Sequence, residues 1–256
     1  MDLNPIERFT VRADDYAKYR PGYPPGIIGI LEREVGFSRN QTVADIGSGT
    51  GLLTKLFLEN GNRVFGVEPN SGMRHHAESS LSGFRRFVSV KGTAEHTTLR
   101  ERSVDLVTMG QALHWFDPDG TAAELARISK PGGSLCIAYN ETRRGSEVMR
   151  AFRNVTVRNE GRRRNEPNVG LRYSRRFFKG GRLSRFVLPN EQTLDFEGLL
   201  GRLLSGSHMP TRNEPTRLRK LERDVRRLFD SFQEEGRIRL LYDTRLFVGR
   251  IARPAK

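Results

Sequence analysis

The sequence predicts an α/β fold of the doubly wound kind, in which helices cover both faces of a mostly parallel sheet. Two observations support this class. Strand-like and helix-like segments alternate from Gln41 to Asn140, which is the pattern of right-handed βαβ crossovers. A glycine-rich turn, "GSGTG" at Gly47–Gly51, follows the first of these strands. Ligands of such sheets bind at the carboxyl ends of the strands, so we expect the functional residues in the loops that follow each strand.

The core elements are expected in a regular order. A helix begins at the proline pair of "RPGYPPG" and runs to about Glu34, since proline suits a first helical turn. Later helices carry apolar residues at helical spacing, and the strands are short apolar runs. The expected strands are "TVADI", "NRVFGVE", "RRFVSVKG", "SVDLVTMG" and the segment after the turn in "PGGSLCIAYN", and the expected helices between them cover 50–59, 71–80 and 117–130.

Beyond Asn140 the character of the sequence changes. We expect three regions: 1–140 with N-terminal lid helices and the cofactor-binding core, 141–212 as a small, basic and irregular insert on the substrate side, and 213–256 completing the core sheet. Residues 214–235 have an apolar stripe at helical spacing. The segment "GRIRLLYDTRLFVGRI" is interpreted as an antiparallel hairpin with its turn near Asp243.

Composition and charge narrow the class of protein. The 256 residues contain no apolar run long enough to span a bilayer. The N-terminal "MDLNPIERFT" lacks an apolar signal core, so a cytoplasmic protein is expected. The single cysteine, Cys136, excludes an intrachain disulfide and a cysteine metal cluster, and no metal site is expected. We expect Cys136 to lie in the core.

The net charge of +14 is unevenly distributed. Residues 1–140 have 16 basic and 16 acidic side chains, whereas 141–190 have 14 basic against 4 acidic. One interpretation is a solvated, arginine-rich surface. The other is an attraction for an anionic substrate or for nucleic acid.

The glycine turn does not fit a phosphate-binding motif. A dinucleotide fingerprint requires a third glycine where Leu52 stands, and a P-loop requires a lysine after the last glycine. Glu68 ends the second strand, 17 residues after Gly51, where a carboxylate can accept both hydroxyls of a ribose. An acidic residue in "GTAEHTTL", after the third strand, can accept from an adenine amine. Together these features predict a nucleoside site without a pyrophosphate.

Four ordered motifs carry a family resemblance. The stretches "VADIGSGTG", "VFGVEPN", "GTAEHTTL" and "SVDLVTMGQALHWFD" resemble those of class I S-adenosylmethionine-dependent methyltransferases, which have a Rossmann-like fold. The stretches "DDYAKYRPGYP", "LLSGSHMP" and "YDTRLFVGRI" resemble, more weakly, the trans-aconitate-methyltransferase-like branch, which acts on small molecules. One departure is that "HTTLRER", after Glu95, lacks the proline usual in this loop.

The resemblance implies S-adenosylmethionine as the cofactor and assigns roles to matching residues. The glycine turn with its serine would line the methionine and ribose, an aspartate would help to hold the amino-acid end, and later residues would contact ribose and adenine. The implied cofactor-binding residues are Asp45, Gly47, Ser48, Gly49, Gly51, Glu68, Pro69, Met73, Ala94, Glu95 and Gln111.

Residues for catalysis and substrate binding are less specific. His114, in "GQALHWFD", is the candidate general base for a hydroxyl or amine acceptor, but we favour a role with Trp115 in the pocket wall. In "YAKYRPGYP", Tyr16, Tyr19 and Arg20 are interpreted either as a lid over the cofactor or as an anchor for the first helix, with equal weight. Two further substrate-side candidates, each more readily explained as structural, are His208 and Tyr173.

Three functions remain open at this point. The favoured one is transfer of a methyl group to a small acceptor, anionic (a carboxylate) or hydroxyl-bearing, with no membrane partner. The second is an RNA or protein methyltransferase that docks through the basic insert, where aromatic side chains interleave with arginines; nucleic acid is a less favoured partner because no RNA-binding module is recognisable. The third is a non-catalytic module that binds S-adenosylmethionine. The interleaved aromatics are Tyr173, Phe177, Phe178 and Phe186.

Overall fold

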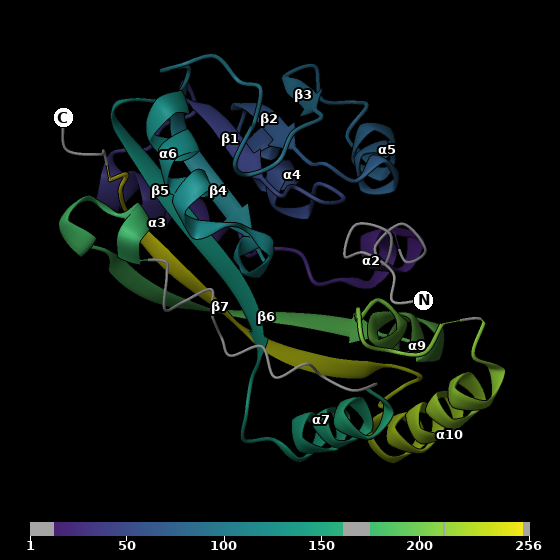
Figure 1. The fold of residues 1–256 in the computed structure, drawn as a ribbon. Coiled ribbons are helices and arrows are strands. Elements are labelled where there is room, and N and C mark those ends of the chain that lie inside the picture. Colours follow the sequence, from purple (N-terminus) through teal and green to yellow (C-terminus); the bar gives the residue numbers. More distant parts are fainter. Residues whose placement is uncertain (1–12, 161–174, 212, 253–256) are drawn as a thin grey trace. The chain divides into compact units, whose positions relative to one another are not determined.

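A computed structural model describes residues 13–160, 175–211 and 213–252 (Figure 1). Its helices and strands alternate through the first half of the chain, as predicted. In order they are α2 (Ala13–Tyr19), α3 (Gly26–Val35), β1 (Thr42–Ile46), α4 (Leu52–Glu59), β2 (Arg63–Val67), α5 (Ser71–Ser80), β3 (Phe87–Val90), β4 (Val104–Gly110), the 3₁₀ turn η1 (Leu113–Trp115), α6 (Pro118–Ile128), β5 (Ser129–Thr142), α7 (Glu147–Asn159), the 3₁₀ turns η2 (Arg175–Phe177) and η3 (Lys179–Gly181), β6 (Ser184–Leu194), α9 (Phe196–Leu204), α10 (Pro215–Phe232) and β7 (Ile238–Arg250).

The seven strands form one sheet in the order β3-β2-β1-β4-β5-β7-β6. Strands β3, β2, β1, β4 and β5 pair in parallel. From β1 the chain proceeds outward through β2 and β3 and then returns to β4 on the other side, so the strand order reverses between β1 and β4. This is the topology of a doubly wound sheet, which places a ligand site outside the carboxyl ends of β1 and β4. The predicted fold class is confirmed.

The C-terminal strand β7 runs antiparallel to β5. Arg143 N–H donates to Leu241 O, and Ile251 N–H donates to Gly133 O, so residue numbers fall along β7 as they rise along β5. The antiparallel addition is thus confirmed.

The predicted turn near Asp243 is wrong, because 238–250 forms a single strand. Leu240, Tyr242, Thr244 and Leu246 are all fully buried, and this two-residue period continues through Asp243 where a turn would have broken it. The edge neighbour of β7 is β6.

The interpretation of 141–212 as irregular is also wrong. This region contains α7, β6 and α9. Along β6, partly buried positions alternate with exposed ones, so Phe186 and Leu188 alternate with Arg185 and Val187. A strand at the edge of a sheet buries only part of its surface, and its sequence therefore lacks a continuous apolar run.

The chain divides into two compact units. The core unit contains 22–140, 167–188 and 244–256, and the helical unit contains 1–21, 141–166 and 189–243. One of the breaks between the two units falls after Asn140. The N-terminal residues, however, group with the helical unit rather than with the core, and the C-terminal residues from Thr244 group with the core. Among the described residues, no helix is both long and apolar enough to cross a membrane.

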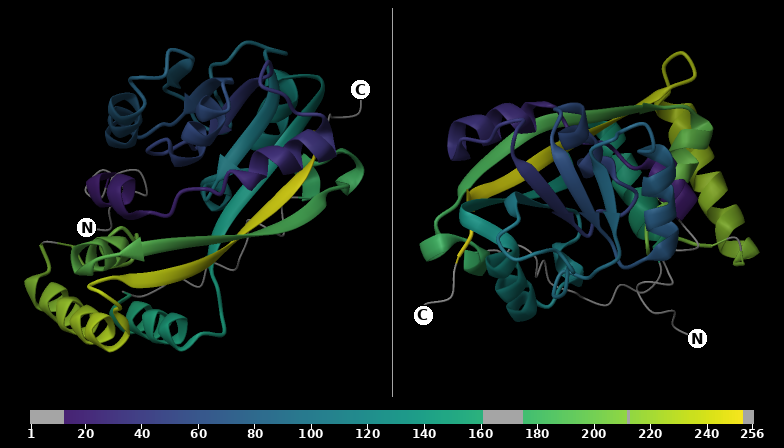
Figure 2. Two further views of the ribbon diagram at one scale, coloured as in Figure 1. Left: turned by 180° about the vertical axis from the view of Figure 1, so that it is seen from behind. Right: turned by 90° about the horizontal axis from the view of Figure 1, so that it is seen from above.

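The core unit packs apolar side chains on both faces of its sheet. Neighbouring residues in one strand enter different clusters, as Val43 and Ala44 of β1 do, because successive side chains of a strand point to opposite faces. Helices α3 and α4 pack on one face and α6 on the other, and Figure 2 shows α3 and α6 on opposite sides of the sheet. Cys136 lies within this core, as predicted, and burial raises the pKa of its thiol to about 12.

The helical unit has a core of its own. The predicted apolar stripe of α10 is buried through Leu221, Val225, Leu228 and Phe229. These side chains pack with apolar residues of α7, α9 and the first part of β7.

Candidate functional site

The glycine turn connects β1 to α4, and its three glycines serve different purposes. Gly47, Gly49 and Gly51 have φ values of 67°, 55° and 86°, a left-handed conformation that side chains disfavour. A Cβ on Gly47 would lie 2.7 Å from Ala112 Cβ, and one on Gly51 would lie 2.7 Å from Leu81 Cδ1. A Cβ on Gly49 would meet nothing within 4 Å. Gly47 and Gly51 are therefore needed for packing, whereas Gly49 leaves a bare backbone facing open space.

Glu68, at the end of β2, is bonded to this turn. Its Oε2 accepts from Gly49 N–H at 3.0 Å, and its Oε1 accepts from Asn70 N–H at 2.9 Å. The residue is only 9% exposed. Burial raises the pKa of the Glu68 carboxyl, against the opposing effect of the two N–H donors and of Arg74. A carboxylate offers about four acceptor positions, so each oxygen retains capacity for one hydroxyl of a ribose beside the open face of Gly49. These residues fit the nucleoside of S-adenosylmethionine.

Asp45 lies beneath the turn, on β1. Its Oδ2 accepts from Thr54 Oγ1 at 2.6 Å and its Oδ1 from Thr108 Oγ1 at 2.8 Å. The side chain is fully buried, and this burial raises the pKa of the carboxyl to about 6. With both oxygens engaged and no access to solvent, Asp45 supports the turn from below. Its predicted contribution at the amino-acid end of the cofactor stays a prediction.

The residues predicted around the adenine lie after β2 and β3. Asn70 caps α5 by accepting from Met73 N–H at 2.9 Å, and Met73 is buried. Ala94 is also buried, and Glu95 Oε1 accepts from Asp117 N–H at 2.8 Å. Glu95 is therefore tied to the start of α6, with one carboxylate oxygen engaged.

Of the remaining predicted cofactor residues, Pro69 follows β2, where its O accepts from Arg74 Nη1 at 2.8 Å, and Ser48 and Gln111 lie at the ends of β1 and β4. Ser48 N–H donates to Val67 O at 3.1 Å. Gln111 has a φ of 55°, uncommon for a residue with a side chain. Its N–H donates to Ala138 O at 3.0 Å and its Nε2 to Asn140 O at 2.9 Å. These bonds hold the strained residue at the carboxyl edge of β4, and such strain is concentrated at functional sites.

His114 and Trp115 lie on η1, between β4 and α6. Both side chains are exposed, and their rings are 4.8 Å apart at a tilt of 46°. Neither ring belongs to the hydrophobic core. The general-base role and the pocket-wall role of His114 both remain predictions.

The helix α2 carries Tyr16, Tyr19 and Arg20 and belongs to the helical unit. The Tyr19 ring contacts Gly201 of α9 so closely that a Cβ there would lie 2.2 Å from it. Arg20 Nη2 donates to Ser205 O at 2.9 Å, and its guanidinium lies 4.9 Å from the centre of the Tyr16 ring. These contacts are those of an anchor for α2, while closure over the cofactor stays a prediction.

The two remaining substrate-side candidates are His208 and Tyr173, and their roles stay predictions. His208 follows α9 and is exposed. Tyr173 lies outside the described residues.

Several polar residues at the carboxyl edge were missed in the sequence. Asn140, at the end of the fifth strand, donates from Nδ2 to Gly22 O at 3.0 Å and accepts from Thr244 Oγ1 at 2.5 Å. Tyr23 lies so close to Gly110 that a Cβ there would be 2.6 Å from the Tyr23 hydroxyl. The position of Asn140 could have been found by the rule that ligands bind where strands end. Thr54 and Thr108, which donate to Asp45, could not have been found in this way, because nothing in the sequence indicates their pairing with Asp45.

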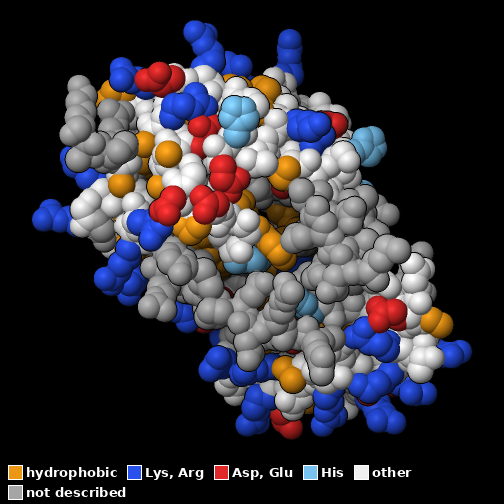
Figure 3. Space-filling view, in the orientation of Figure 1, with side chains coloured by type: hydrophobic (Ala, Val, Ile, Leu, Met, Phe, Trp, Pro, Cys, Tyr) orange, Lys and Arg blue, Asp and Glu red, His pale blue; other side chains and the backbone are white. Residues whose placement is uncertain are grey.

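Charged side chains are unevenly spread on the face shown in Figure 3. Lysine and arginine side chains gather over α7 and α10 and also lie over much of the core unit, where a group of acidic side chains gathers as well. In the core unit Arg176 is paired with Asp119 at 2.5 Å. In the helical unit Arg143 is paired with Asp243 at 2.9 Å. Some of the basic side chains of 141–190 are therefore already engaged within the protein.

Comparisons with known proteins show that the first half of the chain is similar to methyltransferases. A family model described as a methyltransferase domain matches residues 44–137. An uncharacterized methyltransferase of Mycobacterium tuberculosis is 38% identical over 125 residues, which is 49% of each chain. The chain thus spans about half the length of the curated relatives it matches.

Solved structures show the same fold over most of the chain. A candidate type II methyltransferase of Anaeromyxobacter dehalogenans has a TM-score of 0.69 at 24% identity, covering 92% of this chain and 100% of that one. The [4+2]-cyclase SpnF has a TM-score of 0.54 at 13% identity, covering 93% and 94%. The finer resemblance to the trans-aconitate branch is not confirmed by these comparisons.

Proposed function

We propose that the chain is a class I S-adenosylmethionine-dependent methyltransferase that transfers a methyl group from S-adenosylmethionine to a small acceptor bearing a carboxylate or a hydroxyl. The match of residues 44–137 to a methyltransferase domain, the similarity to a methyltransferase of Mycobacterium tuberculosis and the shared fold support this proposal. One observation carries the proposal. The Glu68 carboxylate is bonded to the open Gly49 backbone and retains acceptor capacity, in a turn that lacks the residues of a phosphate site. A nucleoside without a pyrophosphate is the ligand that such a turn suits.

Each part of the site has a task in this proposal. When bound, the cofactor supplies a methyl group that its sulfonium already activates. Glu68 accepts the ribose hydroxyls, Ala94 and Glu95 contact the adenine, and Gln111 orients the methionine portion. The protein contributes mainly alignment and the exclusion of water, and alignment alone can supply up to roughly 7–11 kcal/mol.

The acceptor determines whether a base is needed. A carboxylate acceptor is already a nucleophile and needs none, whereas a hydroxyl must lose a proton during transfer. In the second case His114, on η1 at the carboxyl edge, is the proposed base. A screen of metabolites for release of S-adenosylhomocysteine identifies the acceptor. The substitution His114→Asn then separates the two cases, because it should lower kcat only if the acceptor is a hydroxyl.

Calorimetric titration with S-adenosylhomocysteine tests the cofactor site. The wild type should bind it and should not bind NAD. The substitution Glu68→Ala should weaken binding by about 1–3 kcal/mol, because it removes hydrogen bonds to a charged group. Glu59→Ala is the matched control, as Glu59 is exposed and paired with Lys55. Tight NAD binding, or unchanged affinity in a folded Glu68→Ala variant, would contradict the proposal.

An RNA acceptor is the main rival, and salt dependence distinguishes it. Docking on RNA through 141–190 would neutralise several phosphates, so affinity would fall with salt at a slope near −0.7 per phosphate for single strands. The internal pairing of Arg143 and Arg176 supports the small-acceptor proposal instead. In a gel-shift titration we expect only weak RNA binding that fades at modest salt. Sub-micromolar binding that persists at 0.15 M salt would reverse this order.

A further inference from the structure

The loop from Lys91 to Ser103 carries the two residues proposed to contact the adenine, yet it contains no helix or strand. Within the loop, Thr93 N–H donates to His96 O and His96 N–H donates to Thr93 Oγ1. These bonds form only a small turn, and Thr98 has a φ of 62°. The loop must therefore be held in shape by groups outside it.

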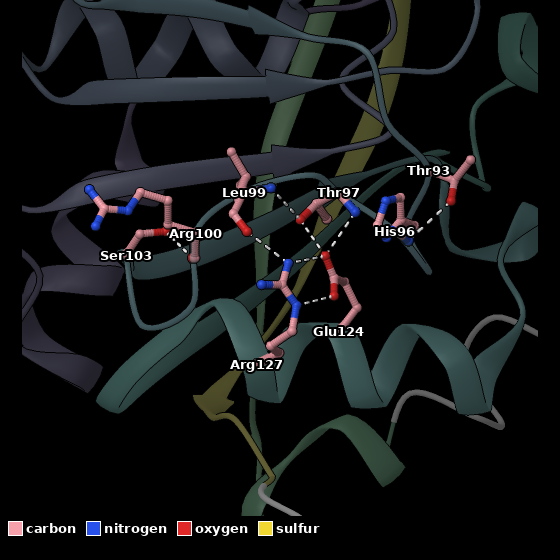
Figure 4. A network of polar contacts seen from close by, with 8 residues as sticks. All are labelled: Thr93, His96, Thr97, Leu99, Arg100, Ser103, Glu124 and Arg127. Carbon is pink, nitrogen blue, oxygen red and sulfur yellow. Dashed lines mark hydrogen bonds and ion pairs between the residues drawn. The ribbon is translucent and has the colours of Figure 1, made fainter.

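One carboxylate of α6 supplies that support. Glu124 Oε1 accepts from Thr97 N–H at 2.8 Å and from Thr97 Oγ1 at 2.5 Å. Thr97 Oγ1 in turn accepts from Leu99 N–H at 3.2 Å. Glu124 is 5% exposed, so these bonds lie away from solvent. Figure 4 shows Glu124 reaching from α6 to the backbone and side chain of Thr97.

Arg127, one turn further along α6, completes the contact. Its Nε donates to Glu124 Oε2 at 2.6 Å, and its Nη2 donates to Glu124 Oε1 at 2.7 Å and to Leu99 O at 2.8 Å. The guanidinium therefore joins the carboxylate and the loop backbone in one bidentate arrangement, which is among the strongest polar contacts in proteins. Burial alone would raise the pKa of the Glu124 carboxyl, but the hydrogen bonds from Arg127 and Thr97 hold it at about 2.

A second contact joins the loop to the other end of α6. Glu95 accepts from Asp117 N–H at 2.8 Å, and Asp117 caps the helix by accepting from Gly120 N–H at 2.7 Å. The segment Gly92–Leu99 is thus fixed to α6 at two points, Glu95 and Thr97, and the buried Ala94 directly precedes the first of them. Since α6 packs on the sheet through Leu125 and Ile128, it is a rigid support.

We propose that Glu124 and Arg127 are positioning residues for the cofactor. The ion pair between them holds Gly92–Leu99 in the conformation that contacts the adenine. This inference rests on the proposed function. Glu124 does not contact the cofactor in this arrangement, because its oxygens are occupied by Thr97 and Arg127. Its effect is transmitted through the loop to Ala94 and Glu95.

The test measures selectivity for the base and not affinity alone. The protein is titrated with S-adenosylhomocysteine and with its inosine analogue, in which the 6-amine is a carbonyl. The dissociation constant of the inosine analogue divided by that of S-adenosylhomocysteine measures recognition of the adenine edge and exceeds one where the amine is recognised. In Glu124→Gln the amide cannot accept from both arginine donors, so the loop is released. We expect adenosyl binding to weaken about tenfold, the scale of losing one bond to a charged group, and the ratio to fall toward one.

Two further variants guard against a merely structural explanation. Thr97→Val removes the hydroxyl that bonds Glu124 and should lower the ratio, whereas Thr97→Ser keeps the hydroxyl and should restore it. Glu101→Gln is the matched control, since Glu101 lies on the same loop but is exposed and paired with Arg102. If Glu124→Gln fails to fold, the threonine pair decides the question.

The outcomes separate this inference from the proposed function. Failure of the wild type to bind S-adenosylhomocysteine overturns both. Binding by the wild type, with an unchanged ratio in folded Glu124→Gln or in Thr97→Val, overturns the positioning role alone. A lowered ratio in both variants, or in Thr97→Val alone if Glu124→Gln does not fold, with a wild-type ratio in Thr97→Ser and Glu101→Gln, supports it.

Discussion

Substituting Asp45 by asparagine should change how the stability of the protein depends on pH. The pKa of the buried Asp45 carboxyl is about 6 in the folded chain, against an ordinary value of 3.8. At 1.36 kcal/mol for each tenfold change in the ionisation constant, holding this group charged costs about 3 kcal/mol. Because the folded pKa is the higher one, the contribution to stability is fully present below about pH 4 and is lost as the pH rises through 6. Between pH 5 and 8 the loss is roughly 1 kcal/mol.

The assay is urea unfolding of the wild type and Asp45→Asn at several pH values, followed by the fluorescence of Trp115, the single tryptophan. Asparagine does not titrate, so the free energy of unfolding of the variant, relative to that of the wild type, should rise by roughly 1 kcal/mol from pH 5 to 8. The altered hydrogen bonds to Thr54 and Thr108 shift the difference between variant and wild type by the same amount at every pH, so they cancel in the change of that difference from pH 5 to 8. Asp230→Asn, an exposed change on α10, is the matched control. A flat difference for Asp45→Asn would refute the reasoning.

Three other predictions concern packing. Gly49→Ala should cost about 1–2 kcal/mol of stability from backbone strain alone, whereas Gly51→Ala should cost more because its Cβ meets the Leu81 side chain; thermal unfolding of both variants with equal losses would contradict the geometry. Gly201→Ala should displace the Tyr19 ring and make α2 more susceptible to limited proteolysis, and an unchanged cleavage pattern would argue against the anchor. Cys136 should resist thiol reagents at pH 8 until the protein is unfolded, as its thiol is buried with a pKa of about 12, so rapid labelling of the native protein would be unexpected.

The glycine turn between β1 and α4 could be predicted from the sequence because its parts are local. The spacing of Gly47, Gly49 and Gly51 sets the backbone of a short turn, and the absence of a third fingerprint glycine at Leu52 excludes phosphate motifs without reference to distant residues. Glu68 could be placed as well, since parallel strands end at a common edge. The alternation of strands and helices determined the doubly wound class for the same reason, because each crossover is a local pattern.

Other features were decided only by tertiary structure. Whether 238–250 turns at Asp243 depends on the strands beside it, because β5 and β6 supply the partners that make one long strand favourable. The hydrogen bond from Thr97 in the segment Gly92–Leu99 is accepted by Glu124, 27 residues further along the chain. The hydrogen bond to Asp45 beneath the glycine turn comes from Thr108, 63 residues away. A sequence period reports which face a side chain occupies, but it does not report which polar group lies opposite. That information arises only when helix and sheet pack together, since the burial of a carboxylate is tolerated only where packing brings donors to it.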